Sequence, residues 1–153
     1  MATEIEAKLR VDSHDEVRSA LQRHGAVALG QVLETNHILD NADGRLRSQG
    51  GALRLRINAP VGGGAAGAVL TFKGPVEPGR LKRRRELETG LDDPATTLEL
   101  LAVLGFVEVM VYAKRRDSYR LGNCRVELDE VPLLGCFVEI EGAAETVNNN
   151  GHP

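Results

Sequence analysis

Aromatic side chains are scarce in this chain, which has no tryptophan, two tyrosines and three phenylalanines. Aromatic rings build the stacking platforms of single-strand nucleic-acid binders and the cages that hold quaternary ammonium groups. The formal net charge of −3 also argues against binding of nucleic acid through bulk positive charge. We therefore expect no nucleic-acid partner.

Cysteines and long apolar runs are equally rare. Cys124 and Cys136 are the only cysteines, too few for a disulfide framework in a chain of 153 residues. No apolar run approaches the length of about 20 residues that a membrane span requires. The charged, alternating first residues have no signal-peptide character. We expect reduced thiols, no membrane partner and a cytoplasmic location.

The hydrophobic fraction of 42% is sufficient for one core in 153 residues. We expect a single domain over residues 1–145. Residues 146–153 contain the run Asn148-Asn149-Asn150 and are predicted to form a disordered polar tail.

Two helices are predicted from their end signals. Ser13 and Glu16 have the spacing of a capping box, and Gly25 provides a C-terminal stop. Asp93 followed by Pro94 predicts the start of a second helix, because proline is favoured at the first helical position.

Most of the remaining chain alternates in polarity and predicts strands. Their approximate ranges are 3–11, 30–40, 51–58, 68–73, 80–91, 107–120, 123–131 and 135–141. Most connections are short, so the sheet should be mostly antiparallel, and about eight such strands can close into a barrel. The expected fold is α+β: an eight-stranded antiparallel closed barrel with two flanking helices.

The predicted strands carry unusually many charges on one face. In the first strand Glu4, Glu6 and Lys8 share a face, because successive side chains point to opposite sides. The same pattern recurs in Arg54 and Arg56, Thr71 and Lys73, Lys82 to Glu88, Lys114 and Arg116, Glu127 and Asp129, and Glu139 and Glu141.

The sequence allows two placements of these charged faces. They are either the solvated exterior around an apolar core or the lining of a wet interior. Burying one unpaired ion costs several kcal/mol, against a total stability of about 5–15 kcal/mol. An inward arrangement therefore needs water and compensating signs, which suit a channel that binds a polyanion with a divalent metal.

The order of the charged motifs resembles one family. Glu4-x-Glu6-x-Lys8 is similar to the opening of the CYTH family, also called the triphosphate tunnel metalloenzymes. Further similar motifs follow over roughly residues 2–142: Arg54-x-Arg56, Thr71-Phe72-Lys73-Gly74-Pro75, Arg84-x-Glu86-x-Glu88, Lys114-x-Arg116-x-x-Tyr119, Glu127-x-Asp129 and Phe137-Val138-Glu139-Ile140-Glu141. The resemblance implies an eight-stranded tunnel with a charged interior, and residues 40–56 favour the class IV adenylyl cyclase-like branch.

The resemblance also implies roles for individual residues. Mg²⁺ or Mn²⁺ would be held by Glu4, Glu6, Asp129, Glu139 and Glu141. The triphosphate would be bound by Lys8, Arg54, Arg56, Lys73, Lys82, Arg84, Lys114 and Arg116. Catalytic roles are expected for Glu4, Glu6, Lys8 and Lys114.

Three functions fit these expectations. The first is a class IV-like adenylyl cyclase that converts ATP to cyclic AMP and pyrophosphate. The second is an inorganic tripolyphosphatase or a thiamine triphosphatase, and the third is a non-catalytic module that binds polyphosphate or nucleotide. The expected partner is thus ATP, tripolyphosphate or thiamine triphosphate, bound by a monomer or homodimer.

The sequence departs from the family after Glu141. Family members usually continue into a helix that plugs or flanks the tunnel, whereas only a dozen residues follow here. We expect at most a turn of that helix and a more open tunnel end.

Overall fold

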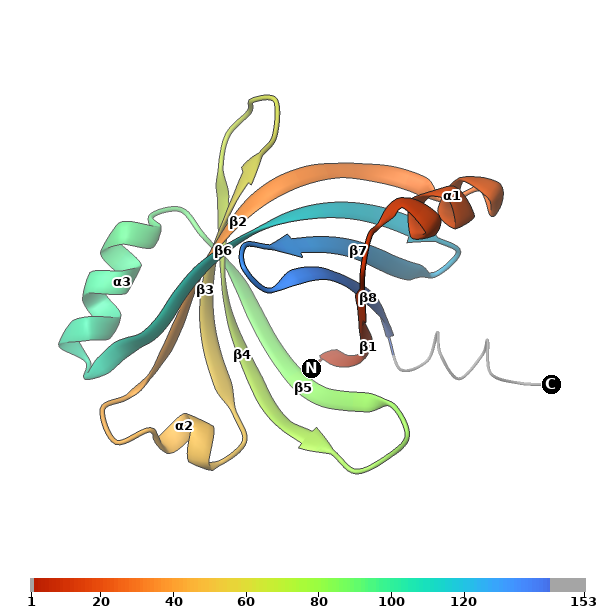
Figure 1. The fold of residues 1–153 in the computed structure, drawn as a ribbon. Coiled ribbons are helices and arrows are strands. Elements are labelled where there is room, and N and C mark those ends of the chain that lie inside the picture. Colours follow the sequence, from red (N-terminus) through yellow and green to blue (C-terminus); the bar gives the residue numbers. More distant parts are fainter. Residues whose placement is uncertain (1, 144–153) are drawn as a thin grey trace.

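The computed structural model describes residues 2–143, with side chains described for residues 5–142 (Figure 1). The predicted tail at 146–153 lies outside the described residues. The elements in chain order are β1 (Ala2–Val11), α1 (Asp15–Arg23), β2 (Val27–Asn41), α2 (Arg45–Ser48), β3 (Ala52–Pro60), β4 (Gly67–Glu77), β5 (Lys82–Leu91), α3 (Pro94–Val103), β6 (Phe106–Leu121), β7 (Cys124–Val131) and β8 (Gly135–Ala143).

The eight strands form a closed barrel in the order β1-β5-β4-β3-β2-β6-β7-β8. All neighbouring strands are antiparallel. The predicted eight-stranded antiparallel barrel is therefore confirmed. β1 closes the barrel, because it pairs with β5 on one side and with β8 on the other.

The apolar core lies outside the barrel wall rather than within it. Leu21 of α1 packs against Val126 and Leu128 of β7 and Val138 of β8, and all four are buried. These strand residues alternate with the charged positions of β7 and β8, which consequently face the interior. α1 and α3 lie on opposite sides of the barrel (Figure 1).

The two predicted helices are present, but one of the predicted caps is wrong. α1 begins at Asp15 after His14, and no side chain caps it. The Ser13 hydroxyl accepts a hydrogen bond from the Asp15 N–H at 3.2 Å, one residue too early for a capping box. In α3 the predicted cap is confirmed, because Asp93 Oδ1 accepts from the Thr96 N–H at 3.0 Å.

A third, four-residue helix, α2, was not predicted. It depends on a partner outside the helix: the carboxylate of Asp40 accepts from the N–H groups of Leu46 and Arg47 at 2.9 and 3.1 Å. Within the described part of the chain, no helix is long and apolar enough to cross a bilayer.

Candidate functional site

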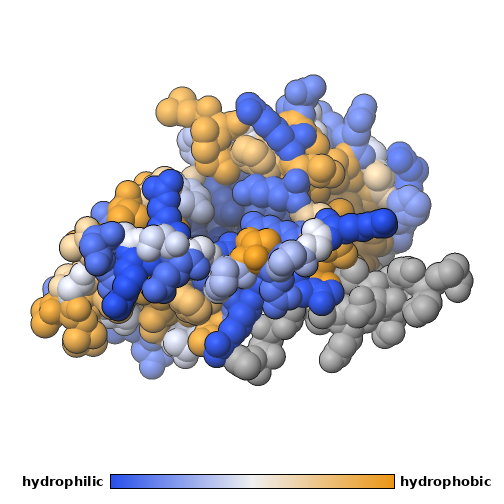
Figure 2. Space-filling model, turned by 90° about the horizontal axis from the view of Figure 1, so that it is seen from below, coloured by the Kyte–Doolittle hydropathy of each residue, from blue (hydrophilic) through white to orange (hydrophobic). Residues whose placement is uncertain are grey.

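The barrel encloses a cavity of about 1350 Å³ lined by side chains from all eight strands. The space-filling view shows hydrophilic side chains gathered around a hollow (Figure 2). Eight lining residues are basic: Lys8, Arg54, Arg56, Lys73, Lys82, Lys114, Arg116 and Arg125. Seven are acidic: Glu6, Glu34, Glu86, Glu88, Glu127, Glu139 and Glu141. The charged faces thus line the interior, and their signs nearly balance.

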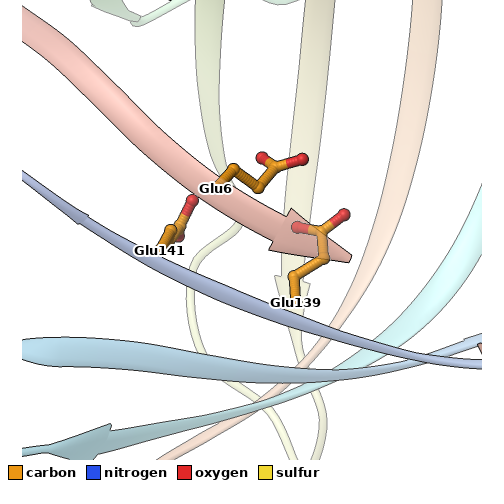
Figure 3. Close-up of side chains that lie close together, drawn as sticks. All are labelled: Glu6, Glu139 and Glu141. Carbon is orange, nitrogen blue, oxygen red and sulfur yellow. The ribbon is translucent and has the colours of Figure 1, made fainter. Parts of the chain in front are cut away.

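Three of the predicted metal ligands meet on one wall of this cavity. Glu6 of β1 lies opposite Glu141 of β8 in the ladder, and Lys8 lies opposite Glu139. Glu6, Glu139 and Glu141 each offer a carboxylate oxygen within 4.8 Å of the other two (Figure 3). We call these three residues the acidic cluster. The side chain of Glu4 lies outside the side chains that the structure describes.

The acidic cluster suits a hard divalent cation. Carboxylate oxygens are the ligands that Mg²⁺ and Mn²⁺ prefer. Two lysines stand nearby: Lys8 Nζ is 3.5 Å from Glu139 Oε1, and Lys82 Nζ is 3.6 Å from Glu6 Oε1. Both lysine side chains are about half exposed, at 49% and 45%. Glu139 Oε2 also accepts a hydrogen bond from Arg116 Nη2 at 3.1 Å, so basic side chains border the acidic cluster.

Asp129, also predicted as a metal ligand, is placed differently. It is 1% exposed and is not part of the acidic cluster found among the described side chains. Its carboxylate accepts from Lys114 Nζ at 2.9 Å and from Arg116 Nε and Nη2 at 2.7 and 2.8 Å. In this structure Asp129 is therefore the counterion of two tunnel cations.

Asp129 links folding stability to pH. Burial alone would raise the pKa of its carboxyl, but the hydrogen bonds and charges of Arg116 and Lys114 hold that pKa below 3.8. A carboxyl with a lowered pKa stabilises the fold above its unfolded pKa, and this contribution is lost as pH falls through the folded value.

We therefore expect Asp129→Asn to cost about 3–5 kcal/mol in free energy of unfolding at pH 7, because it leaves buried cations unpaired. The difference in free energy of unfolding between variant and native protein should become smaller below pH 4, because the native carboxyl becomes protonated there. Urea denaturation from pH 7 to pH 3 measures both effects, with Glu77→Gln, an exposed change on β4, as control. A difference in free energy of unfolding that stays constant from pH 7 to pH 3 would contradict this role for the ionised carboxylate.

Lys114 and Arg116 of β6 are both buried, at 4% and 7% exposed. Burial, followed by the charge of Arg116, lowers the pKa of Lys114 despite the attraction of Asp129. Burial acts in the same direction on Arg116, but hydrogen bonds to Asp129 and the charges of Glu34 and Glu139 raise its pKa above the ordinary value. Arg116 is thus a fixed cation, whereas Lys114 holds its proton less firmly.

Arg54 and Arg56 of β3 differ in how they are held. Arg56 Nε donates to Asn36 Oδ1 at 2.7 Å and lies 3.1 Å from Glu34 Oε1. Arg54 Nε is buried without a hydrogen-bond partner, and Arg54 makes no ion pair with any residue in the described part of the chain. Burial and the charge of Arg54 lower the pKa of Arg56. β3 therefore presents one oriented guanidinium beside one that lacks an anion.

The remaining predicted phosphate ligands divide into two groups. Lys73 and Lys82 line the cavity, and Lys73 Nζ lies 4.0 Å from Glu86 Oε2. Arg84 is not among the lining residues, because its guanidinium donates to the backbone carbonyls of Gly74 and Gly50 at 2.8 and 3.2 Å. In this structure Arg84 ties β5 to β4 and to the segment before β3.

Two interior residues of β2 were not predicted as site residues. Glu34 is 1% exposed and Asn36 is 0% exposed, and both contact Arg56. Glu34 and Asn36 are two residues apart, so strand alternation could have placed both on the inner face. The pattern was obscured because Val32, Leu33, Ile38 and Leu39 put apolar side chains on both faces of the same strand.

A closed antiparallel barrel with basic walls and an acidic cluster inside is the architecture of a triphosphate tunnel. The family profile of the CYTH domain matches residues 2–149, and the chain belongs to this family.

Relatives agree with this assignment. The Methanocaldococcus jannaschii protein named "Putative adenylate cyclase" is 26% identical over 95% of this chain and 79% of its own length. A solved Pyrococcus horikoshii protein is 27% identical, with a TM-score of 0.82, covering 96% of this chain and 83% of that one. A Hippeastrum structure shares the fold at 24% identity and a TM-score of 0.72, covering 98% of this chain and 84% of that one. It is described as a "putative adenylyl cyclase" with a dominant triphosphatase activity.

Proposed function

We propose that this protein is a divalent-metal-dependent enzyme that converts ATP to cyclic AMP and pyrophosphate, as class IV adenylyl cyclases do. The observation that carries the proposal is the presence, in one cavity, of the acidic cluster and of Arg54, whose guanidinium makes no ion pair among the described side chains. A metal-bound triphosphate would place a cation at the acidic cluster and an anion at Arg54.

The basic wall would hold the triphosphate chain. Arg54 would take a phosphate oxygen directly, since charge-assisted hydrogen bonds from arginine to phosphate are strong. Arg56, Lys73, Lys114 and Arg116 would bind further oxygens, and Lys8 and Lys82 would do so beside the acidic cluster. Arg84 would act through the backbone segments that it holds.

Glu6, Glu139 and Glu141, with Glu4 on the same strand face, would hold Mg²⁺ or Mn²⁺. Such a metal neutralises phosphate oxygens and lowers the pKa of a bound hydroxyl. Asp129 would serve the metal site indirectly, by fixing Arg116, which lies 3.1 Å from Glu139 Oε2.

Catalysis would consist mostly of positioning and electrostatic stabilisation, as in other phosphoryl-transfer enzymes. In the cyclase reaction the ribose 3′-hydroxyl attacks the α-phosphate in line with the departing pyrophosphate. Lys8 and Lys114 are the lysines proposed to act on the reacting groups. The lowered pKa of Lys114 suits a residue that passes a proton to the leaving oxygen.

The second candidate is hydrolysis of tripolyphosphate or thiamine triphosphate. The triphosphatase activity ascribed to the Hippeastrum neighbour favours it. The same tunnel residues would serve, with water attacking the terminal phosphate.

Incubation with ATP, thiamine triphosphate or tripolyphosphate, each with Mg²⁺ and with Mn²⁺, tests the proposal. We expect cyclic AMP and pyrophosphate from ATP only when a metal is present. Release of orthophosphate without cyclic AMP would replace the cyclase by the hydrolase. Tight binding of all three compounds with no turnover would indicate a non-catalytic binding module.

A further inference from the structure

Glu34 is an interior carboxylate that has no role in the proposed binding of metal or triphosphate. It projects from the middle of β2 into the cavity wall and is 1% exposed. Burying a carboxylate is costly unless cations compensate it. Its position opposite Lys114 in the β2–β6 ladder places it among the cations proposed to bind phosphate.

Three basic side chains surround this one carboxylate. Glu34 Oε1 lies 3.1 Å from Arg56 Nε and 3.7 Å from Lys114 Nζ. Glu34 Oε2 lies 3.5 Å from Arg116 Nη1. One carboxylate of β2 thus connects the basic residues of β3 and β6 across the wall.

Glu34 and Asp129 hold these cations in different ways. Asp129 accepts three short hydrogen bonds from Lys114 and Arg116. Glu34 Oε1 is buried but accepts no hydrogen bond, so it attracts the neighbouring cations through its charge alone. Lys114 and Arg116 can therefore turn from Glu34 to another anion while their bonds to Asp129 persist.

Arg56 has the same arrangement. Its Nε is hydrogen-bonded to Asn36 Oδ1, and Glu34 adds charge without a hydrogen bond to its Oε1. Each of the three cations thus has at least one hydrogen-bonded partner besides Glu34, and Glu34 is the anion that all three share. A phosphate oxygen that replaced Glu34 as the nearest anion would find the cations already placed.

We infer that Glu34 is a positioning residue and an internal counter-anion: it gathers Arg56, Lys114 and Arg116 in the empty tunnel and competes with the triphosphate for them. This inference rests on the proposed function, because it assumes that the tunnel binds a triphosphate. It predicts two effects of opposite sign when the carboxylate is removed.

In Glu34→Gln, binding of inorganic tripolyphosphate without metal should tighten by about tenfold, because one repelling charge is removed beside three cations. The kcat for the best substrate should fall by about a hundredfold, because misplacement of binding groups by about 1 Å has effects of that size. KM should fall or stay the same. A residue with only a structural role would weaken binding and activity together.

Glu34→Asp separates charge from position, because it keeps the carboxylate but shortens its reach. Its affinity for metal-free tripolyphosphate should remain native while its kcat falls. Glu108→Gln is the matched control, because Glu108 is 46% exposed, contacts His37 and does not line the cavity, and it should leave both quantities unchanged. Calorimetric titration with tripolyphosphate and steady-state kinetics give the two readouts, and urea denaturation shows that each variant is folded.

Native kcat in Glu34→Gln, or tripolyphosphate affinity no tighter than native in the folded variant, would overturn the inference. Failure of the proposed function has a different signature, because native protein would then turn over no triphosphate. The binding comparison between native protein, Glu34→Gln and Glu34→Asp would still decide the role of Glu34.

Discussion

Replacing Glu6 with glutamine is expected to lower metal-dependent turnover by about a thousandfold without unfolding the protein. Metal coordination supplies several kcal/mol of transition-state stabilisation, and each 1.36 kcal/mol corresponds to about a factor of ten in rate. Glu6 is the suitable member of the acidic cluster to change. Glu6 forms an ion pair with the half-exposed Lys82, whereas Glu139 also contacts the buried Arg116.

The measurement is initial rate against Mg²⁺ and Mn²⁺ concentration for native protein and Glu6→Gln. We expect the variant to need much more metal and to recover only part of the native rate at saturation. Glu77→Gln, an exposed change on β4, is the control for loss of one negative charge. Full activity of Glu6→Gln at native metal concentrations would refute the metal assignment.

Arg116→Met is expected to cost about 3–5 kcal/mol in free energy of unfolding, because the change leaves buried carboxylates without their cation. Arg116 pairs with Asp129, Glu34 and Glu139 inside the barrel. Methionine fills similar space but cannot neutralise these charges. Urea denaturation at pH 7 measures the loss.

Arg54→Met is the matched comparison, because it removes the same group from the same cavity. Arg54 has no protein anion to abandon among the described side chains, so stability should not fall. Tripolyphosphate affinity should drop by about tenfold to a hundredfold, since a hydrogen bond to a charged group contributes about 1.5–3 kcal/mol. If Arg54→Met lost as much free energy of unfolding as Arg116→Met, the inference that only Arg116 neutralises buried carboxylates would be contradicted.

Much of the barrel could be predicted because strand alternation is a purely local rule. Glu4, Glu6 and Lys8 share a face whatever else the chain does. The predicted convergence of Glu6 with Glu139 and Glu141 agrees with the β1–β8 register. α2 was missed because Asp40, a neighbour outside the helix, holds its four residues.

The roles of Asp129 and Arg84 could not be predicted from strand alternation alone. Alternation places Asp129 on the inner face, but the β6–β7 register decides that Arg116 lies opposite it. For Arg84, an irregularity in the β4–β5 ladder between Lys73 and Val76 brings the Gly74 carbonyl within its reach. Both outcomes depend on pairings between distant segments, which a single strand does not encode.

The place of β1 between β5 and β8 has a consequence for biosynthesis. The ribosome makes β1 first and β8 last, at about 5–20 residues per second. The ladder that joins Glu6 to Glu141 therefore forms only after the final strand has been synthesised. Until then the growing sheet has unpaired edges that favour association with other chains. The proposed metal binding at the acidic cluster and closure of the barrel should consequently appear together, once β8 has left the ribosome and paired with β1.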